Sequence, residues 1–398
     1  INSGTLSMTG GTTNSGTINM STNYTPNTIT SNTGTINVNG GTLTLGSITA
    51  NTGTINVNGS GAISGTLTGS NTASLNIGTS STSGVTPVAT SFTTGGGITI
   101  PIVTTNTNGT SVSVQNSISI SNRLTVASGT TINIIASGSF TGAGTVNNSG
   151  TISISSGPFN MAGALTNSGT INIGNTYTPP SDMGNNTGII NINSGGVASG
   201  NLFTAGGTIN INRATGAVTG TISGSGAAKL QIGTSTSAAP AAVSFTTSNS
   251  ISNMPTINLL TSGTALTSNH NITGVNTIFS LASGTSATIN QQLAGTGYID
   301  NYGTLTFASG STFSSFSNVQ MQSNSTLNLN NTATLPCTIT GVNTTGNTVN
   351  IGVSSGVTIT TNKTISNLNI LELKGTSGNK LTTSSLITNI NNLNVLSP

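Results

Sequence analysis

The chain has 398 residues, of which 2% are charged, 3% are aromatic and 53 are glycine, and its formal net charge is +3. The low charge argues against intrinsic disorder, which combines low hydrophobicity with high net charge. Phosphate binding needs clustered Lys and Arg, so the scattered basic residues exclude nucleic acid as a partner: Arg123, Arg213, Lys229, Lys363, Lys374 and Lys380.

The sequence contains no run of 18 apolar residues, so no segment is predicted to span a membrane. The chain starts at Ile1 without a Met or a signal peptide, and we expect it to be a processed product or an excised piece. A single cysteine, Cys337, excludes an internal disulfide framework. We expect Cys337 to be a small buried hydrophobe, with an intermolecular bridge as the alternative.

A short phrase recurs from the start of the chain and predicts β-strands. GTINM at 16–20 returns as GTINV at 34–38 and 53–57. Apolar and polar residues alternate within each phrase, as in a strand with one buried face, and the preceding Gly supplies a turn that tolerates a positive φ. In two runs the central apolar residues recur every 18–21 residues, and we expect them to face inward: Ile18, Ile36, Ile55 and Leu75, then Ile132, Ile152, Ile171, Ile190, Ile209 and Leu230.

Strands at this spacing, without any helical pattern between them, indicate the coils of a solenoid. Each coil buries its inward residues against the coils above and below, and its backbone pairs with the same neighbours. We therefore predict an all-β fold, a parallel β-helix (β-solenoid) with about 18–21 residues per coil. About 21 such coils would fit in the chain, and they would form a rod about 100 Å long.

A longer repeat is superimposed on the coils. The segment 14–19 returns at 167–172, and the YTP of 24–26 returns at 177–179, both with an offset of 153 residues. The longer unit therefore contains about eight coils and is duplicated. We predict five parts: an opening coil at 1–13, a first module at 14–166, a second at 167–319, a diverged partial third at 320–362, and a C-terminal segment at 363–398.

The C-terminal segment gathers four charged residues, Lys363, Glu372, Lys374 and Lys380, beside two apolar runs. Solenoids need distinct ends because an open last coil has an unpaired edge. The segment is therefore a cap or, alternatively, a docking surface for another subunit or the next module. The docking candidates are the apolar residues of the two runs: Leu368, Ile370, Leu371, Leu373, Leu386 and Ile390.

Polysaccharide-cleaving enzymes also use parallel β-helices, so catalysis is the rival hypothesis. Glycoside hydrolysis needs two carboxylates about 5–9.5 Å apart. The candidates Asp182, Asp300 and Glu372 are separated by about six and four coils, or about 30 and 18 Å. His270, the only histidine, is expected in an exposed turn. The ligand sets of metal sites and a phosphate-binding loop before a helix are missing, so we predict no enzyme, no metal and no cofactor.

The outward positions of the phrases predict ladders along the stack, with Thr before and Asn after each inward Ile. Hydrogen bonds along such ladders would stabilise the solenoid. Alternatively, a flat hydroxyl array orders water, as at an ice surface, or contacts a glycan. The ladder candidates are Thr17, Thr35, Thr54, Thr170, Thr208, Asn37, Asn56 and Asn210.

The Asn-x-Gly-Thr-Ile-Asn-Val phrases at this spacing resemble the passenger regions of bacterial autotransporters and filamentous-haemagglutinin-type adhesins. The resemblance covers nearly the whole chain and implies a right-handed parallel β-helix displayed outside the cell. Those families share no universal functional residues, so none is carried over. We expect a non-enzymatic, extracellular structural or adhesive rod. Its expected partners are copies of itself end to end, further repeats of the same polypeptide, or a host or abiotic surface.

Overall fold

The computed structural model describes residues 6–60, 62–70, 72–79, 82–180, 183, 185–193, 195–212, 217–233, 242–352, 356–374 and 378–396. These residues form 48 β-strands and no helix. The chain divides into two compact units: unit 1 comprises Ile1–Ile190 and Gly195–Ser199, and unit 2 comprises Asn191–Ser194 and Gly200–Pro398. Strand β24 (Ile189–Ile192) contains the boundary between them.

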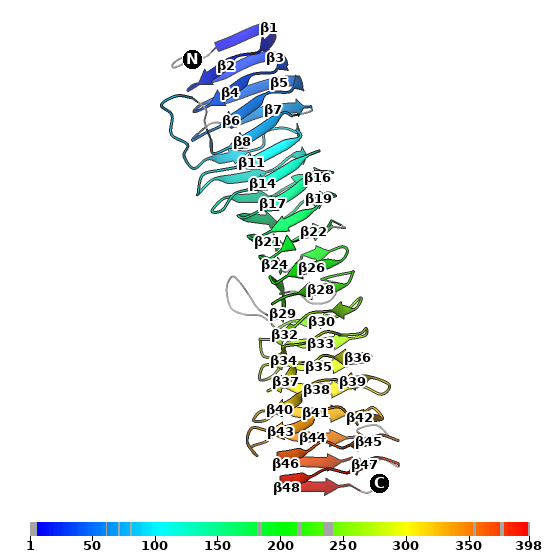
Figure 1. Cartoon of the computed structure of the whole chain (residues 1–398). Helices are drawn as coiled ribbons and strands as arrows, with labels where there is room; N and C mark the ends of the chain where they lie inside the picture. The colour runs from blue at the N-terminus through cyan, green and yellow to red at the C-terminus, as the bar shows by residue number, and fades with distance from the viewer. Residues whose placement is uncertain are drawn as a thin grey trace. The chain divides into compact units, whose positions relative to one another are not determined.

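Unit 1 is a stack of coils in which each strand pairs in parallel with the equivalent strand of the next coil (Figure 1). Its strands form three sheets. Sheet A contains β1 (Leu6–Asn14), β3 (Tyr24–Asn32), β5 (Thr42–Asn51), β7 (Ala62–Gly69), β10 (Ile98–Thr99), β13 (Ser117–Ser119), β16 (Ser139–Gly142), β19 (Phe159–Met161), β22 (Thr176–Tyr177) and β25 (Val197–Ala198). Sheet B contains β2 (Thr17–Met20), β4 (Thr35–Val38), β6 (Thr54–Val57), β8 (Ser74–Ile77), β11 (Ile102–Thr105), β14 (Arg123–Val126), β17 (Thr145–Asn148), β20 (Leu165–Asn167) and β23 (Asn185–Asn186). Sheet C contributes β9 (Ser91–Thr93), β12 (Ser111–Val114), β15 (Thr131–Ile134), β18 (Thr151–Ile154) and β21 (Thr170–Ile173).

Unit 2 has three columns of parallel strands. The first column contains β27 (Thr208–Ile211), β29 (Lys229–Ile232), β32 (Thr256–Leu259), β34 (Ile278–Leu281), β37 (Tyr298–Asn301), β40 (Asn318–Met321) and β43 (Thr338–Gly341). The second contains β30 (Ser244–Thr246), β33 (Ala265–Ser268), β35 (Ser286–Ile289), β38 (Thr304–Phe307), β41 (Thr326–Leu329) and β44 (Thr348–Ile351). The third contains β26 (Leu202–Ala205), β28 (Ile222–Ser225), β31 (Ile251–Ser252), β36 (Gln292–Ala294), β39 (Thr312–Ser314), β42 (Ala333–Leu335), β45 (Thr358–Thr361) and β47 (Lys380–Thr383).

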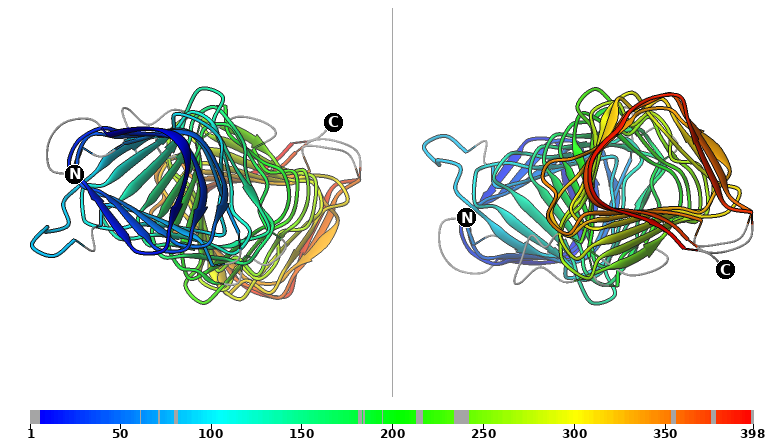
Figure 2. Two further views of the ribbon diagram at one scale, coloured as in Figure 1. Left: turned by 90° about the horizontal axis from the view of Figure 1, so that it is seen from above. Right: turned by 90° about the horizontal axis from the view of Figure 1, so that it is seen from below.

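Two long strands complete unit 2. Strand β46 (Ile365–Leu373) pairs with β43 through its first part and with β44 through its second part. Strand β48 (Ile387–Val395) then pairs with β46 along its length. When the structure is viewed along the stack, successive coils of unit 2 follow one another around the same closed outline (Figure 2).

The predicted parallel β-solenoid is therefore confirmed, whereas its handedness stays a prediction. The described residues form about 17 turns rather than the predicted 21. Early coils follow the predicted spacing, since β2, β4 and β6 begin at Thr17, Thr35 and Thr54. Other coils are longer: the starts of β8 and β11, at Ser74 and Ile102, are 28 residues apart. These longer coils account for the smaller number of turns.

The predicted inward residues form the core. Side chains one strand apart pack on each other because the pairing is in register; Ile36 lies beside Ile55, for example. Five of the six isoleucines of the GTIN and related phrases are completely buried: Ile36, Ile55, Ile171, Ile190 and Ile209. Ile18 is half-buried, so it is less buried than predicted.

Aromatic side chains form a second kind of ladder inside unit 1. The rings of Phe140, Phe159 and Tyr177, on successive strands of sheet A, lie 5.9 Å apart between centroids. Burial without a charged partner raises the pKa of the Tyr177 hydroxyl well above its usual range. Large apolar side chains therefore fill the interior of the coils and stack directly on one another.

The Asn-x-Gly corners before strands such as β18, β21 and β24 have a specific structural cause. Asn148 Nδ2 donates to Asn167 Oδ1, and Asn167 Nδ2 donates to Asn186 Oδ1, each at 2.7 Å, so buried amides link one corner to the next. At Gly169 a Cβ atom would lie 2.1 Å from the Gly150 carbonyl oxygen. Gly169 does not have a positive φ, so the predicted reason for this glycine is wrong. Close approach of two backbones requires it.

Candidate functional site

The first predicted ladder lies on the outward side of β2, β4, β6 and β8 in unit 1. Asn37 Nδ2 donates to Asn19 Oδ1 at 2.8 Å, Asn56 Nδ2 to Asn37 Oδ1 at 2.8 Å, and Asn76 Nδ2 to Asn56 Oδ1 at 3.0 Å. An amide can donate and accept at once, so each Asn bonds to the copies on both sides. The ladder therefore links four successive coils by hydrogen bonds between side chains.

A segment that sequence reasoning did not anticipate covers this amide ladder. We call residues 82–90 the covering loop; it follows β8 and reaches back toward β2, and it is part of the light-blue loop beside β4 and β6 in Figure 1. Thr82 Oγ1 donates to Asn19 Oδ1 at 2.7 Å and accepts from Asn39 Nδ2 at 2.8 Å. Asn58 Nδ2 donates to the Thr86 carbonyl, and the Val88 amide donates to Asn58 Oδ1.

The asparagines of the predicted surface ladder are buried, so this part of the prediction is wrong. Asn37 is completely buried and Asn56 is 5% exposed, so neither amide is available at the surface of unit 1. In unit 2, Asn210 is also 5% exposed, and its Nδ2 donates to Asn191 Oδ1 at 2.7 Å. The predicted threonines do lie on outward positions. Thr17 is exposed, and the others are half-buried: Thr35, Thr54, Thr170 and Thr208.

A more regular outward array lies on unit 2. We call it the Thr face, and it consists of the outward residues of β35, β38, β41 and β44: Ser286, Thr288, Thr304, Thr306, Thr326, Asn328, Thr348 and Asn350. Each of these residues is half-buried, whereas the residue between each pair is buried. The array forms two columns about 6.6 Å apart, with members about 4.8 Å apart along the stack.

Sequence reasoning missed the Thr face although its signal was present. The strands β38, β41 and β44 begin with Thr and alternate polar and apolar residues, and they start 22 residues apart. Their phrases read TLTF, TLNL and TVNI, and they lack the GTIN pattern that predicts the other ladders.

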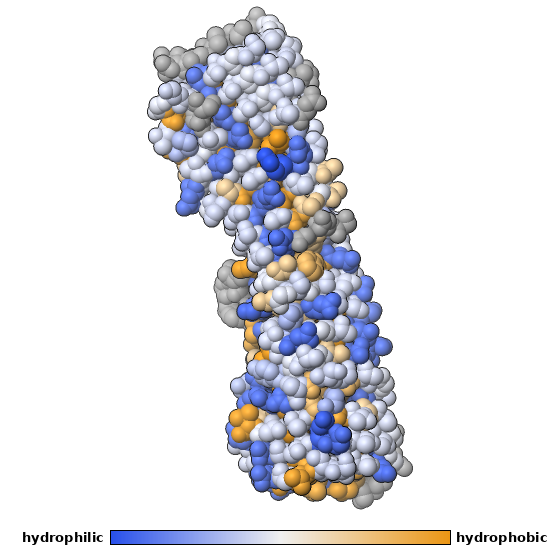
Figure 3. Space-filling model, in the orientation of Figure 1, coloured by the Kyte–Doolittle hydropathy of each residue, from blue (hydrophilic) through white to orange (hydrophobic). Residues whose placement is uncertain are grey.

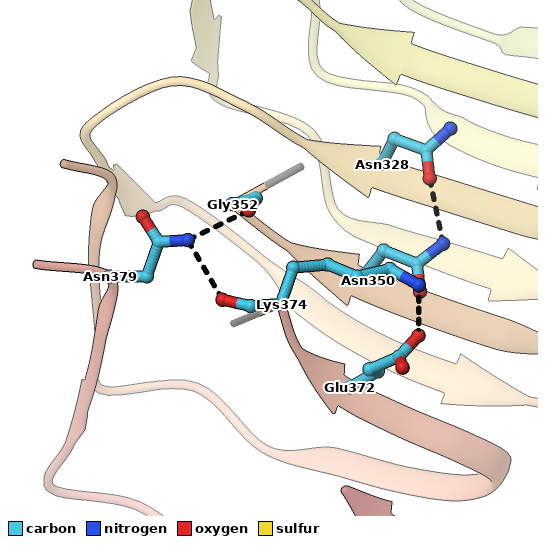
Figure 4. Close-up of polar contacts among 6 residues, drawn as sticks. All are labelled: Asn328, Asn350, Gly352, Glu372, Lys374 and Asn379. Atoms are coloured by element: carbon cyan, nitrogen blue, oxygen red, sulfur yellow. Dashed lines mark hydrogen bonds and ion pairs between the residues drawn. The ribbon is translucent and has the colours of Figure 1, made fainter. Parts of the chain in front are cut away.

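At one end of the Thr face lies a cluster of polar residues (Figure 4). Asn350 on β44 is in register with Glu372 on β46. The carboxylate of Glu372 forms an ion pair with Lys374 Nζ. Asn379 Nδ2 donates to the carbonyl oxygens of Gly352 at 2.7 Å and of Lys374 at 3.0 Å, which ties the segment after β46 to the end of β44.

The carboxylates proposed for glycoside hydrolysis do not come together in the described part of the chain. Asp300 on β37 accepts a hydrogen bond from Gln322 Nε2 at 2.7 Å. Glu372 lies on the part of β46 that pairs with β44, in the second column of unit 2. Strand β46 is three strand spacings from β37, or about 14 Å. Asp182 lies outside the described residues.

The cysteine and the histidine that the sequence singled out both lie in the described part of unit 2. Cys337 is buried, as predicted, and its burial raises the thiol pKa to about 12, although the charge of Lys363 opposes the shift. His270 lies in a bend and is half-buried, so it is less exposed than predicted. Among the described residues, no group of three or more His, Cys, Asp or Glu could hold a metal ion. The described residues also contain no helix that is long and apolar enough to cross a membrane.

The predicted docking residues divide into buried and accessible ones. Leu368 and Leu371 are buried because β48 pairs with β46 and covers them, so these two candidates are wrong. Ile370, Leu373 and Ile390 are half-buried, and Leu386 is 68% exposed.

Two further apolar residues on β48 are exposed that the sequence did not single out, Leu393 at 61% and Val395 at 69%. Apolar residues, coloured orange, are visible at the C-terminal end of unit 2 in Figure 3.

None of the protein-family models, curated proteins and solved structures that were compared with this chain matches it. The fold and the geometry of the described residues therefore define the class of protein, a parallel β-solenoid with polar outward ladders.

Proposed function

We propose that this chain is a non-enzymatic structural or adhesive β-solenoid that acts outside the cell. The observation that supports the proposal is the parallel stack of coils, many of whose outward positions hold Ser, Thr or Asn, with 2% charged residues in the whole chain. Hydrogen-bonded amides such as Asn19, Asn37 and Asn56 link successive coils and consolidate the stack. Such a surface suits contact over an extended area more than turnover at one point.

The same proposal predicts that the described carboxylates have no role in polysaccharide cleavage. Asp300 is hydrogen-bonded to Gln322 and Glu372 is paired with Lys374. Replacing both by their amides, Asp300→Asn and Glu372→Gln, should leave any measured behaviour on polysaccharides unchanged. Reducing-sugar release by the 398-residue chain that disappears in this double variant would show that the protein is an enzyme.

End-to-end association is the part of the proposal that concerns partners. Among the described strands, β48 pairs with β46 only, so its other edge can accept a further parallel strand. Ile387 and Ile390 of β48 are in register with the buried Ile365 and Leu368 of β46. A strand added to β48 would therefore extend the backbone pairing and the apolar core together. We propose that a second copy of the chain, or a further coil of the same polypeptide, occupies this edge.

Sedimentation and electron microscopy of the purified chain test this association. We expect filaments or oligomers that disappear when Leu386 and Leu393 are replaced by Lys, because the charges would be buried in the contact. Leu260→Lys is the matched control, since Leu260 is 41% exposed and follows β32, several coils before β46. Dispersed single chains at all concentrations, or equal loss of assembly in the control, would refute self-association.

The Thr face favours a second candidate function, contact with ice or a glycan surface. Its two columns of Ser, Thr and Asn present hydroxyl and amide groups at the regular spacings of a parallel sheet. We expect thermal hysteresis, or retention on a glycan matrix, that is lost in Thr304→Tyr with Thr326→Tyr. Thr360→Tyr on β45 is the control, because Thr360 is exposed on another column of unit 2. Ordinary ice growth and no retention would remove this candidate.

A further inference from the structure

We propose that Lys374 and Asn350 become joined by an intramolecular isopeptide bond, with Glu372 carrying the proton that the reaction has to move. The bond would link β44 covalently to the segment that follows β46. The inference is independent of the adhesive or structural role proposed above, because it depends only on the arrangement of three side chains in unit 2.

The register of β44 and β46 brings the three residues to one outward surface. Asn350 pairs with Glu372, and the Lys374 amide donates to the Ile351 carbonyl at 2.9 Å, so Lys374 continues the parallel pairing beyond the end of β46. Residues 372 and 374 are two apart and therefore point to the same side as Asn350. Diagonal neighbours in a sheet are about 7–8 Å apart between Cα atoms, a distance that a lysine side chain can span.

The amide of Asn350 is oriented for attack from the side of Glu372 and Lys374. Its Nδ2 donates to Asn328 Oδ1 at 2.8 Å, toward the preceding coil, so its Oδ1 is turned away from that coil. Asn350 Oδ1 is buried and has no hydrogen-bond partner among the described residues, although Asn350 as a whole is half-buried on an outward face. Figure 4 shows the Lys374 side chain extending from the end of β46 toward the Asn350 and Glu372 side chains, with its amino group at the Glu372 carboxylate.

Glu372 supplies the proton transfers. The ion pair first passes one proton from the Lys374 ammonium to the Glu372 carboxylate, which leaves a neutral amine. The amine lone pair then attacks Asn350 Cγ and forms the new C–N bond. A second proton moves from the former Lys374 nitrogen to Asn350 Nδ2, the Cγ–Nδ2 bond breaks, and ammonia leaves. The proton on Glu372 converts that ammonia to ammonium, so charge and atoms balance without any oxidant or cofactor.

The surroundings favour this reaction at Glu372 and Lys374. The Glu372 side chain is 14% exposed and the Lys374 side chain 34%, so water is partly excluded from the ion pair. Reacting groups that one molecule holds in position can reach effective molarities of about 10⁵–10⁸ M. The fixed position of the amine beside the Asn350 amide therefore accelerates an attack that is slow between separate molecules. Each coil of a solenoid contacts only its neighbouring coils. A covalent link between two adjacent coils would oppose their separation.

The intact mass of the purified 398-residue chain tests the proposal. We expect a mass lower than the sequence mass by one ammonia. The chain has no Lys or Arg between Lys229 and Lys363, so after trypsin Asn350 lies in the peptide 230–363. Acylated lysine resists trypsin, and we therefore expect 230–363 to be joined to an uncut peptide 364–380.

Three variants distinguish the isopeptide bond from other losses of ammonia. Lys374→Arg keeps the positive charge beside Glu372 but cannot form the bond. Its mass should therefore equal the mass calculated from its sequence, and its circular dichroism should match that of the unaltered chain. Glu372→Gln should lose at least nine-tenths of the cross-linked peptide. Lys380→Arg, the matched control on β47, should still lose one ammonia. The proposal would be overturned if the unaltered chain had the mass calculated from its sequence. It would also be overturned if the loss of ammonia persisted in Lys374→Arg.

Discussion

Replacing Gly169 by Ala tests whether the close approach of neighbouring corners limits the sequence of this solenoid. A Cβ atom at position 169 would lie 2.1 Å from the Gly150 carbonyl oxygen, a backbone atom that cannot rotate away. Cβ atoms in proteins essentially never come closer than 3.0 Å to another heavy atom, so the two coils would have to separate locally by about 0.9 Å. That movement breaks the pairing of the corner.

The cost follows from the contacts at this corner. The Thr170 amide donates to the Gly150 carbonyl at 2.8 Å, and a displacement of 0.9 Å takes the two atoms beyond hydrogen-bond distance. One lost hydrogen bond costs about 1 kcal/mol, and overpacking costs about 1–3 kcal/mol. We therefore expect Gly169→Ala to lower the free energy of unfolding of unit 1 by about 3 kcal/mol.

The assay is guanidinium unfolding followed by far-ultraviolet circular dichroism, with Gly16→Ala as the control. Gly16 occupies the same position of the same phrase, but a Cβ atom there would meet nothing within 4 Å. The control should change the free energy of unfolding by less than about 0.5 kcal/mol. If both variants unfold at the same denaturant concentration, the explanation of this glycine by close approach is wrong.

Two further predictions concern buried polar groups. Asn167→Ala should destabilise unit 1 by about 2 kcal/mol in the same assay, because it removes both 2.7 Å bonds of a fully buried amide, whereas the exposed Asn147→Ala should have almost no effect. Cys337 contributes stability below its ordinary pKa of 9.0, and this stability should decline as the pH rises toward the folded value of about 12, since the unfolded thiol ionises first. Cys337→Ala should lack that decline, and equal pH profiles would contradict the prediction.

The fold could be predicted because every coil repeats the same local information. Residues such as Ile36 and Ile55 alternate with polar neighbours and recur at almost constant spacing, and only a stack of coils satisfies both patterns. The longer interval between β8 and β11 was visible as a break in the spacing. It gave no indication that residues 82–90 fold back over strands of earlier coils, because nothing in one phrase encodes a contact with Asn19, 63 residues away.

The same limit explains the errors among the candidate sites. Leu371 and Leu393 belong to similar apolar runs, and pairing of β46 with β48 decides that the first is buried and the second is exposed. Asn37 and Asn328 each lie two residues after an outward Thr, yet Asn37 is buried in the ladder beneath the covering loop and Asn328 is half-buried on the Thr face. Burial of an outward residue therefore depends on a distant segment, and a local pattern can predict only the side of the strand on which it lies.

In-register stacking also explains why the chain contains so few charges. Each outward residue lies about 4.8 Å from the equivalent residue of the next coil, so a charge that is repeated with the coil would face its own copy. Two like charges at this distance repel by about 1 kcal/mol even in water, and the repulsion recurs at every coil. Asn avoids this cost because its amide both donates and accepts: Asn37 donates to Asn19 and accepts from Asn56. Charge is tolerated where the repeat diverges, and there Glu372 lies beside Asn350 and pairs with Lys374.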